Sequence, residues 1–76
     1  MSGKPVPEDC YLHELESLGA FNGKKRWRCP RTKRIFTWDS LHGEIEVFNR
    51  RGMHLGVMDA NGKFIKSAEE GRSIDV

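Results

Sequence analysis

The apolar residues near the start of the chain follow a helical spacing. Tyr11, Leu12, Leu15 and Leu18 recur at offsets of one, three and three, which places them on one stripe of a helix. Two carboxylates precede the stripe, where they favour the positive end of the helix dipole, and a glycine follows it, as is common where a helix ends. The pattern therefore predicts one N-terminal helix over residues 8–18.

After Gly23 the apolar positions alternate with polar ones at a period close to two, which is typical of half-buried β-strands. Turn signals separate these runs, and Asn61-Gly62 is the strongest because both residues tolerate a left-handed backbone. The expected strands are residues 26–29, 35–38, 44–48, 54–58 and 63–66. Short strands joined by tight turns predict a small, highly twisted antiparallel sheet. With the N-terminal helix packed against this sheet, the expected fold class is α+β. The predicted core is Leu12, Leu15, Ile35, Ile45, Val47, Leu55, Val57 and Ile65.

The length of the chain allows one domain. Seventy-six residues lie near the lower limit at which a domain buries enough apolar surface to fold without help. Residues 1–7 contain one glycine and two prolines, and they predict a flexible leader or a junction with an upstream segment. Residues 8–76 are then expected to form a single, monomeric domain. No apolar run predicts a membrane-spanning helix, so no membrane contact is expected of this domain.

Positive charge is concentrated in one block of the chain. The whole chain carries 13 basic and 11 acidic residues, but residues 24–34 hold seven basic residues and no acidic one. Such a block attracts a polyanion and points to nucleic acid, while a solvated charged face remains the alternative. The candidate RNA-binding residues are Lys24, Lys25, Arg26, Arg28, Arg31, Lys33 and Arg34.

The cysteines and histidines do not form a metal motif. Cys10 and Cys29 show no C-x-x-C spacing, and the three histidines stand at no zinc-ligand spacing to them. We therefore expect no metal and no cofactor. The two cysteines could form one disulfide or remain free, and the sequence leaves both alternatives open.

Residues 38–46 hold the strongest candidate chemistry, because His42 stands there among the carboxylates of Asp39, Glu44 and Glu46. RNA carries its own nucleophile, the 2′-OH, so its cleavage needs a base, an acid and positive charge near the phosphorane, but no metal. Glu46 is the candidate base because a carboxylate is ionised at neutral pH. His42 is the candidate acid, and Asp39 could orient the imidazole and favour its protonated form. The spacing by itself also fits a polar turn followed by a solvated strand face.

Several stretches resemble one known family. They are Lys24-Lys25-Arg26-Trp27, Lys33-Arg34-Ile35-Phe36, Trp38-Asp39-Ser40-x-His42-Gly43-Glu44-Ile45-Glu46, and His54-Leu55-Gly56 followed by Asp59. Together they are similar to the C-terminal ribonuclease domain of cloacin and the ribosome-cleaving colicins, over roughly residues 23–74. The resemblance implies a highly twisted antiparallel sheet. It also implies an endoribonuclease that cuts 16S ribosomal RNA in the decoding centre of the small (30S) ribosomal subunit and so stops translation.

The same resemblance implies which residues act and with what partners. Catalytic roles fall to Asp39, His42, Glu46 and Arg72, the last of which lies in an Arg-x-Ile triplet near the C-terminus. The implied partners are the 30S subunit with its 16S ribosomal RNA, and a cognate immunity protein. The implied location is that of a secreted or cell-surface-delivered toxin domain that acts in the target-cell cytoplasm.

Two departures from the family bear on delivery. The predicted N-terminal helix has no counterpart in the colicin nuclease, and Asp75-Val76 stands where the family has a basic end. These differences favour delivery as the toxin domain of a contact-dependent growth inhibition protein.

Three functions compete at this point. The first is a toxin that cleaves ribosomal RNA, the second a non-catalytic RNA- or ribosome-binding module, and the third a plain interaction domain. A pure RNA binder has no need of carboxylates beside its phosphate site, and an interaction domain does not explain the basic block. We expect His13 to be exposed and passive, His54 to be structural or exposed, and Trp27 and Trp38 to pack in the fold instead of stacking on bases.

Overall fold

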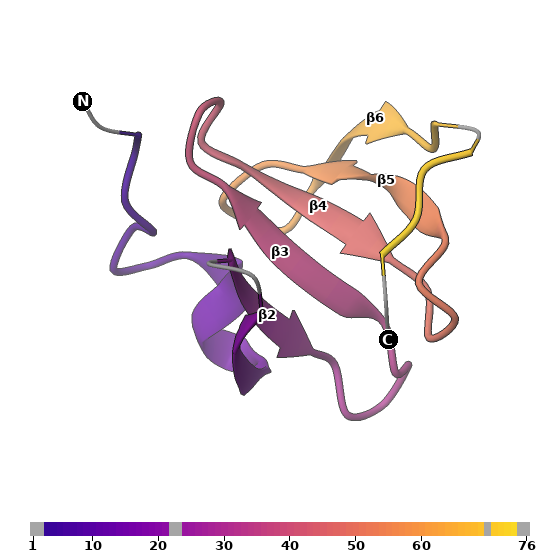
Figure 1. The fold of residues 1–76 in the computed structure, drawn as a ribbon. Coiled ribbons are helices and arrows are strands. Elements are labelled where there is room, and N and C mark those ends of the chain that lie inside the picture. Colours follow the sequence, from indigo (N-terminus) through magenta and orange to yellow (C-terminus); the bar gives the residue numbers. More distant parts are fainter. Residues whose placement is uncertain (1–2, 22–23, 70, 75–76) are drawn as a thin grey trace.

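Six strands follow one another in one antiparallel sheet, in which each strand pairs with its neighbours in the chain (Figure 1). The computed structural model describes residues 3–21, 24–69 and 71–74. The strands are β1 Glu16–Phe21, β2 Lys24–Arg28, β3 Ile35–Asp39, β4 Glu44–Phe48, β5 His54–Met58 and β6 Phe64–Ser67. A 3-10 turn, η1 at Tyr11–Glu14, precedes β1. In the described part of the chain, no helix is long and apolar enough to cross a bilayer.

The predicted N-terminal helix is wrong, and the α+β fold class is wrong with it. Residues 8–18 contain the η1 turn and the start of β1, and the described ranges hold no α-helix. Glu16 of β1 pairs with Arg28 of β2, and Gly19 lies with φ +86° at a β-bulge instead of ending a helix. A lone helix of this length is marginal in water, whereas pairing with β2 satisfies the backbone groups of β1. The antiparallel sheet therefore extends to the N-terminal side of the chain.

The strands predicted from the alternating pattern are confirmed. The ranges 44–48 and 54–58 coincide with β4 and β5, and the range 35–38 lacks only the last residue of β3. The predicted ends of β2 and β6 differ from the observed ends by one or two residues. Alternation and turn chemistry are local signals, so they locate strands without knowledge of the partner strands.

The core lies where η1 packs against β3 and β4. Its largest fully buried side chains are those of Phe36, Leu12, Ile45 and Val47. Among the residues predicted for the core, the buried ones are Leu12, Ile35, Ile45, Val47 and Val57. Leu15 and Leu55 are half-buried and pack against the cluster. The prediction for Ile65 is wrong, because β6 is an edge strand whose four residues are all exposed.

The prediction missed core residues because it assumed that one face of each strand meets solvent. In this small sheet the central strands are buried on both faces, as the burial patterns of β3, β4 and β5 show. The missed strand side chains are those of Phe36, Phe48 and Met58, and Cys10, which precedes η1, was missed as well. Burial on both faces also explains how a glutamate at position 46 comes to be buried.

The flexible leader or junction was predicted over residues 1–7, of which residues 1 and 2 lie outside the described part of the chain. Residues 3–7 contain no helix or strand, and Lys4 lies against the β3–β4 turn. The backbone N–H of Lys4 donates to the carbonyl of Ser40 at 2.6 Å. The indole Nε1 of Trp38 donates to the carbonyl of Lys4 at 2.8 Å. Trp38 also packs against the core and Trp27 is buried, so both tryptophans pack in the fold as expected.

The two cysteines are both free thiols. Cys10 is buried in the core cluster, and Cys29 is half-buried just after β2. Of the two alternatives that the sequence leaves open, the structure has the one without a disulfide.

Candidate active site

The turn between β3 and β4 holds the first half of the site. The Asp39 carboxylate accepts the backbone N–H groups of Leu41 and His42 through Oδ1, at 3.0 and 3.3 Å. Gly43 closes the turn with φ +68°, a backbone conformation that glycine adopts without strain, and its N–H donates to the carbonyl of Asp39 at 2.8 Å. The last residue of β3 thus holds the backbone of the turn that carries the histidine.

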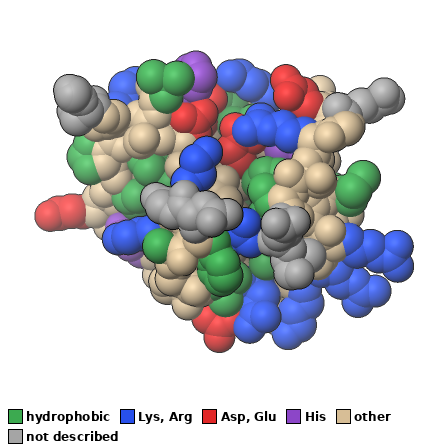
Figure 2. Space-filling view, in the orientation of Figure 1, with side chains coloured by type: hydrophobic (Ala, Val, Ile, Leu, Met, Phe, Trp, Pro, Cys, Tyr) green, Lys and Arg blue, Asp and Glu red, His purple; other side chains and the backbone are tan. Residues whose placement is uncertain are grey.

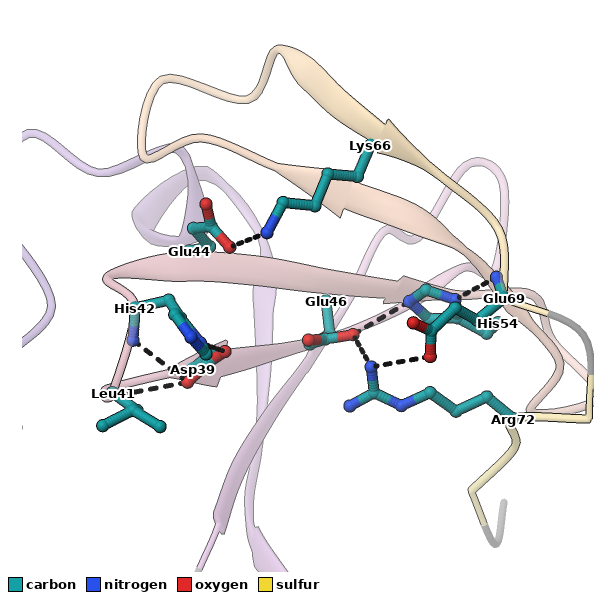
Figure 3. A network of polar contacts seen from close by, with 9 residues as sticks. All are labelled: Asp39, Leu41, His42, Glu44, Glu46, His54, Lys66, Glu69 and Arg72. Carbon is teal, nitrogen blue, oxygen red and sulfur yellow. Dashed lines mark hydrogen bonds and ion pairs between the residues drawn. The ribbon is translucent and has the colours of Figure 1, made fainter.

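Asp39 also orients the His42 ring. Its Oδ2 lies 2.8 Å from Nδ1 of His42 (Figure 3). Burial raises the pKa of Asp39, but hydrogen bonds from the ring and the backbone N–H of His42 outweigh it and hold that pKa below the ordinary 3.8. The carboxylate is therefore ionised at neutral pH and favours a proton on Nδ1. The histidine side chain is 58% exposed, which leaves its Nε2 edge available to a substrate.

Glu46 of β4 forms the second half of the site. Its Oε1 lies 2.8 Å from Nε2 of His54 and 3.0 Å from Nη1 of Arg72. Figure 3 shows His54 and Arg72 approaching this carboxylate from β5 and from the C-terminal segment. The glutamate side chain is 10% exposed, so its charge is partly removed from water and needs these partners.

The C-terminal segment brings Arg72 to Glu46 by pairing with the chain around the start of β5. The N–H of His54 donates to the carbonyl of Arg72 at 3.1 Å, and the N–H of Ile74 donates to the carbonyl of Gly52 at 2.8 Å. A bridge between Met53 and Ser73 lies between these bonds. A residue 26 positions after Glu46 in the sequence therefore contacts it directly.

One open groove joins the two halves. Its lining includes Asp39, His42, Glu46 and Arg72, the four residues for which the resemblance implied catalytic roles. Lys24, Lys25 and Arg26, at the start of β2, line the same groove. The structure thus places acid–base groups and cations along one surface that is open to a polyanion.

The structure divides the predicted basic block. Lys24, Lys25 and Arg26 reach the groove, but Arg28 pairs with Glu16 of β1, with Nη2 and Oε1 2.6 Å apart. The remaining basic side chains of the block are exposed in the β2–β3 connection, and they are those of Arg31, Lys33 and Arg34. Figure 2 shows Lys and Arg side chains gathered at the lower right of this face, over the region where Figure 1 places the β2–β3 and β4–β5 connections.

Asp39, His42 and Glu44 each place one potential ligand atom within 4.8 Å of the others. A carboxylate–imidazole–carboxylate set of this kind is compatible with a divalent cation. Lys66 of β6 approaches the same set, with Nζ 3.2 Å from Oε1 of Glu44. The expectation that the chemistry needs no metal therefore stays a prediction, which chelation tests below.

His54 is the residue whose place in the site was not expected from the sequence. An exposed role is excluded, because its side chain is only 1% exposed. Instead it lies between Glu46 and the C-terminal segment. The pairing of β4 with β5 could have indicated this contact. His54 lies opposite Phe48, and the side chains of Phe48 and Glu46 share one face of β4. His13, in contrast, is exposed and hydrogen-bonds the carbonyl of Pro7, away from the groove.

The Asp39–His42 pair predicts a change of stability with pH. Because the pKa of Asp39 is lowered on folding, its stabilising contribution is complete above the unfolded value near 3.8 and is lost as the pH falls through the folded value. Asp39→Asn should lower the free energy of unfolding by about 1 kcal/mol at pH 6. The difference from the wild type should shrink below pH 3.8, as measured by denaturant unfolding across pH.

Asp59→Asn is the matched control for this experiment. Asp59 accepts the N–H groups of Asn61 and Lys63 in a similar turn, at 2.9 and 3.0 Å, but no histidine pairs with it. If both variants showed the same dependence on pH, the turn bonds would be the cause and the histidine pair would not.

Comparison with known proteins identifies relatives of this chain. A family model described as Cytotoxic matches residues 14–75. Cloacin from Escherichia coli is 36% identical over 58 residues, which cover 74% of this chain and 10% of cloacin. Colicin E3 from Escherichia coli is 38% identical over 53 residues, which cover 67% of this chain and 10% of the colicin. The chain therefore spans about a tenth of the length of these curated relatives.

The match to the family model covers most of the chain and includes every residue named above as lining the groove. It agrees with the resemblance carried by the stretches around Lys24, Trp38 and His54. The chain therefore belongs to the Cytotoxic family, that of the C-terminal ribonuclease domain of colicin E3 and cloacin.

Proposed function

We propose that this chain is a toxin endoribonuclease that cleaves 16S ribosomal RNA in the decoding centre of the small ribosomal subunit and so blocks translation. The observation that carries the proposal is a groove lined by Asp39, His42, Glu46 and Arg72 and also by Lys24, Lys25 and Arg26. Membership of the Cytotoxic family supports the same conclusion. A groove for binding alone would gain nothing from two carboxylates, which repel phosphates.

The proposed reaction is attack by the RNA 2′-OH on the adjacent phosphorus. Glu46 accepts the 2′-OH proton as the bond between O2′ and phosphorus forms. The bond between phosphorus and O5′ breaks as His42, acting as an imidazolium that carries a proton on each nitrogen, transfers the proton on Nε2 to O5′ and keeps the one on Nδ1. The products are a 2′,3′-cyclic phosphate and a 5′-OH end. Asp39 acts through His42 by holding Nδ1 at 2.8 Å, which leaves Nε2 as the nitrogen that faces the substrate.

Arg72 has two roles in this proposal. Its Nη1 lies 3.0 Å from Oε1 of Glu46, where the guanidinium helps to hold the carboxylate of the base in place. Its side chain is 44% exposed, so the guanidinium also meets the groove and can offset the charge that develops on the phosphorane.

The whole-protein context is part of the proposal. A cell that makes such a toxin needs a cognate immunity protein, and an acidic protein is complementary to the basic side chains of the groove. The domain would belong to a secreted or cell-surface-delivered toxin, as in contact-dependent growth inhibition, and would act in the target-cell cytoplasm. The short share of cloacin and colicin E3 that this chain matches fits the toxin domain of a longer protein.

Incubation with intact ribosomes tests the proposal. We expect one discrete 3′ fragment of small-subunit RNA on a sizing gel, because so small a domain recognises the shape of its target more than its sequence. Cleavage should persist in EDTA if no cation acts at Asp39, His42 and Glu44. Ribosomes that bind the chain but stay intact would support the binding module instead. Random degradation of naked RNA at equal protein concentration would contradict the ribosomal target.

A further inference from the structure

We propose that His54 is a positioning residue, which as a neutral imidazole protonated on Nε2 holds Oε1 of Glu46 and leaves Oε2 as the oxygen that accepts the 2′-OH proton. The inference rests on the proposed role of Glu46 as the base. It adds a residue, a tautomer and the identity of the reactive oxygen.

The hydrogen bonds of the His54 ring determine its tautomer. The backbone N–H of Glu69 donates to Nδ1 at 3.0 Å, and a backbone amide can only donate. Nδ1 must therefore carry a lone pair, so the proton lies on Nε2, 2.8 Å from Oε1 of Glu46. Protonation of both nitrogens would set the Nδ1 proton against the Glu69 N–H. The ring is therefore neutral in this arrangement, although it lies beside a carboxylate.

Burial gives His54 its role as a positioning residue. Its side chain is 1% exposed, and its ring packs edge-on against Phe48, with the ring centroids 5.3 Å apart. His54 does not line the groove, and so little of its side chain is exposed that RNA bound there has almost no access to it. Any effect of His54 on cleavage must pass through Glu46 or through the C-terminal segment.

His54 also links the base to the segment that carries Arg72. Its backbone N–H donates to the carbonyl of Arg72 at 3.1 Å, while its ring accepts from Glu69 and donates to Glu46. The guanidinium of Arg72 lies 3.0 Å from the same Oε1. One buried residue thus holds both the proton acceptor and the cation that faces it.

The two contacts on Oε1 identify the reactive oxygen. His54 and Arg72 both approach Oε1, and Figure 3 shows the other oxygen of Glu46 pointing away from His54, on the side of Asp39 and His42. A carboxylate fixed in this way cannot rotate freely, so Oε2 stays directed at the substrate. If this geometry were lost and the carboxylate moved by about 1 Å, the rate of cleavage would fall by about 10²-fold.

The ring nitrogens of His54 give a test that does not depend on activity. In a long-range proton–nitrogen NMR spectrum of the full chain, Nδ1 of His54 should resonate as an unprotonated nitrogen and Nε2 as a protonated one. A protonated Nδ1 would overturn the inference even if the chain cleaves ribosomes. If the wild type did not cleave ribosomes, the proposed function would fail while the tautomer could still be measured.

Two substitutions separate positioning from packing. His54→Gln keeps an N–H donor that can reach Oε1, whereas His54→Leu keeps apolar bulk against Phe48 but has no donor. With folded variants, we expect His54→Leu to lower kcat for ribosome cleavage by about 10²-fold with KM nearly unchanged. His54→Gln should recover most of that loss.

The controls make the result decisive. His13→Leu makes the same change at an exposed histidine away from the groove and should cleave at the wild-type rate. Thermal melting followed by circular dichroism checks that each variant is folded under the assay conditions. Equal kcat values for folded His54→Leu and the wild type would overturn the inference and leave the proposed function standing. So would equal losses for the Leu and Gln variants, because the donor would then make no difference.

Discussion

Glu46→Gln is expected to lower the rate of ribosomal RNA cleavage by about 10²–10⁴-fold, with ribosome binding close to that of the wild type. The amide is nearly isosteric with the carboxylate and can still accept from His54, but it cannot take the 2′-OH proton. His42→Ala should cause a loss of similar size, because the 5′-oxygen then leaves without its proton donor. Single-turnover cleavage of ribosomes and a separate binding assay measure the two effects.

Asp39 provides an internal check on these roles. Asp39 acts by orienting His42 through the 2.8 Å contact at Nδ1. In a chain that already carries His42→Ala, Asp39→Asn should therefore lower the cleavage rate little further. Glu16→Gln is the matched control for Glu46→Gln, since Glu16 forms an exposed ion pair with Arg28 away from the groove. A Glu46→Gln, His42→Ala double variant that cleaves at the wild-type rate would exclude both assignments and favour the binding module.

Replacing Lys24, Lys25 and Arg26 together with Ala is expected to weaken ribosome binding by roughly 10²-fold at 0.1 M salt. These residues line the groove beside the catalytic candidates, so each can neutralise one phosphate. Each lost contact should reduce the slope of log K against log salt by about 0.7, so the slope should fall by roughly 2 in total. A titration of binding at several salt concentrations measures both quantities.

The other end of the basic block supplies a control of equal charge. Arg31, Lys33 and Arg34 are exposed in the β2–β3 connection and do not line the groove, so their replacement by Ala removes the same charge elsewhere. The first triple variant should lose much more affinity than the second. Equal losses would mean that total charge, and not the groove, governs binding.

The division of the basic block depends on strand register, which the sequence does not display. Read along the chain, Arg28 belongs with Lys24 and Arg26, since all three alternate on one face of β2. Register places Glu16 of β1 directly opposite Arg28, and the two side chains pair. Lys24, at the start of β2, lies across from Phe21 instead of an acidic residue. Charge composition located the block but could not tell which of its members face a ligand.

The helix predicted over residues 8–18 failed for a related reason. Helical spacing is a local pattern. In the structure this stretch forms only a short 3-10 turn, which buries Leu12. The backbone of the following residues pairs with β2, in contacts between residues such as Glu16 and Arg28 that the helical pattern does not take into account. The spacing of apolar residues does not show how much the pairing with β2 stabilises the chain. It therefore could not show that a strand is more stable here than a helix.

The sequence alone was sufficient for what depends on neighbouring residues. Strands β3 to β5, their turns and the Asp39–His42 pair follow from alternation, from turn-forming residues and from a separation of three positions. Tertiary structure decided how Glu46 meets its partners, because His54 and Arg72 lie 8 and 26 positions away. Their contact requires the β4–β5 register, burial on both faces of β4 and the pairing of the C-terminal segment with the chain around His54. Contacts of this range arise only when the whole sheet has formed, so the arrangement around the proposed base could be determined only from the fold.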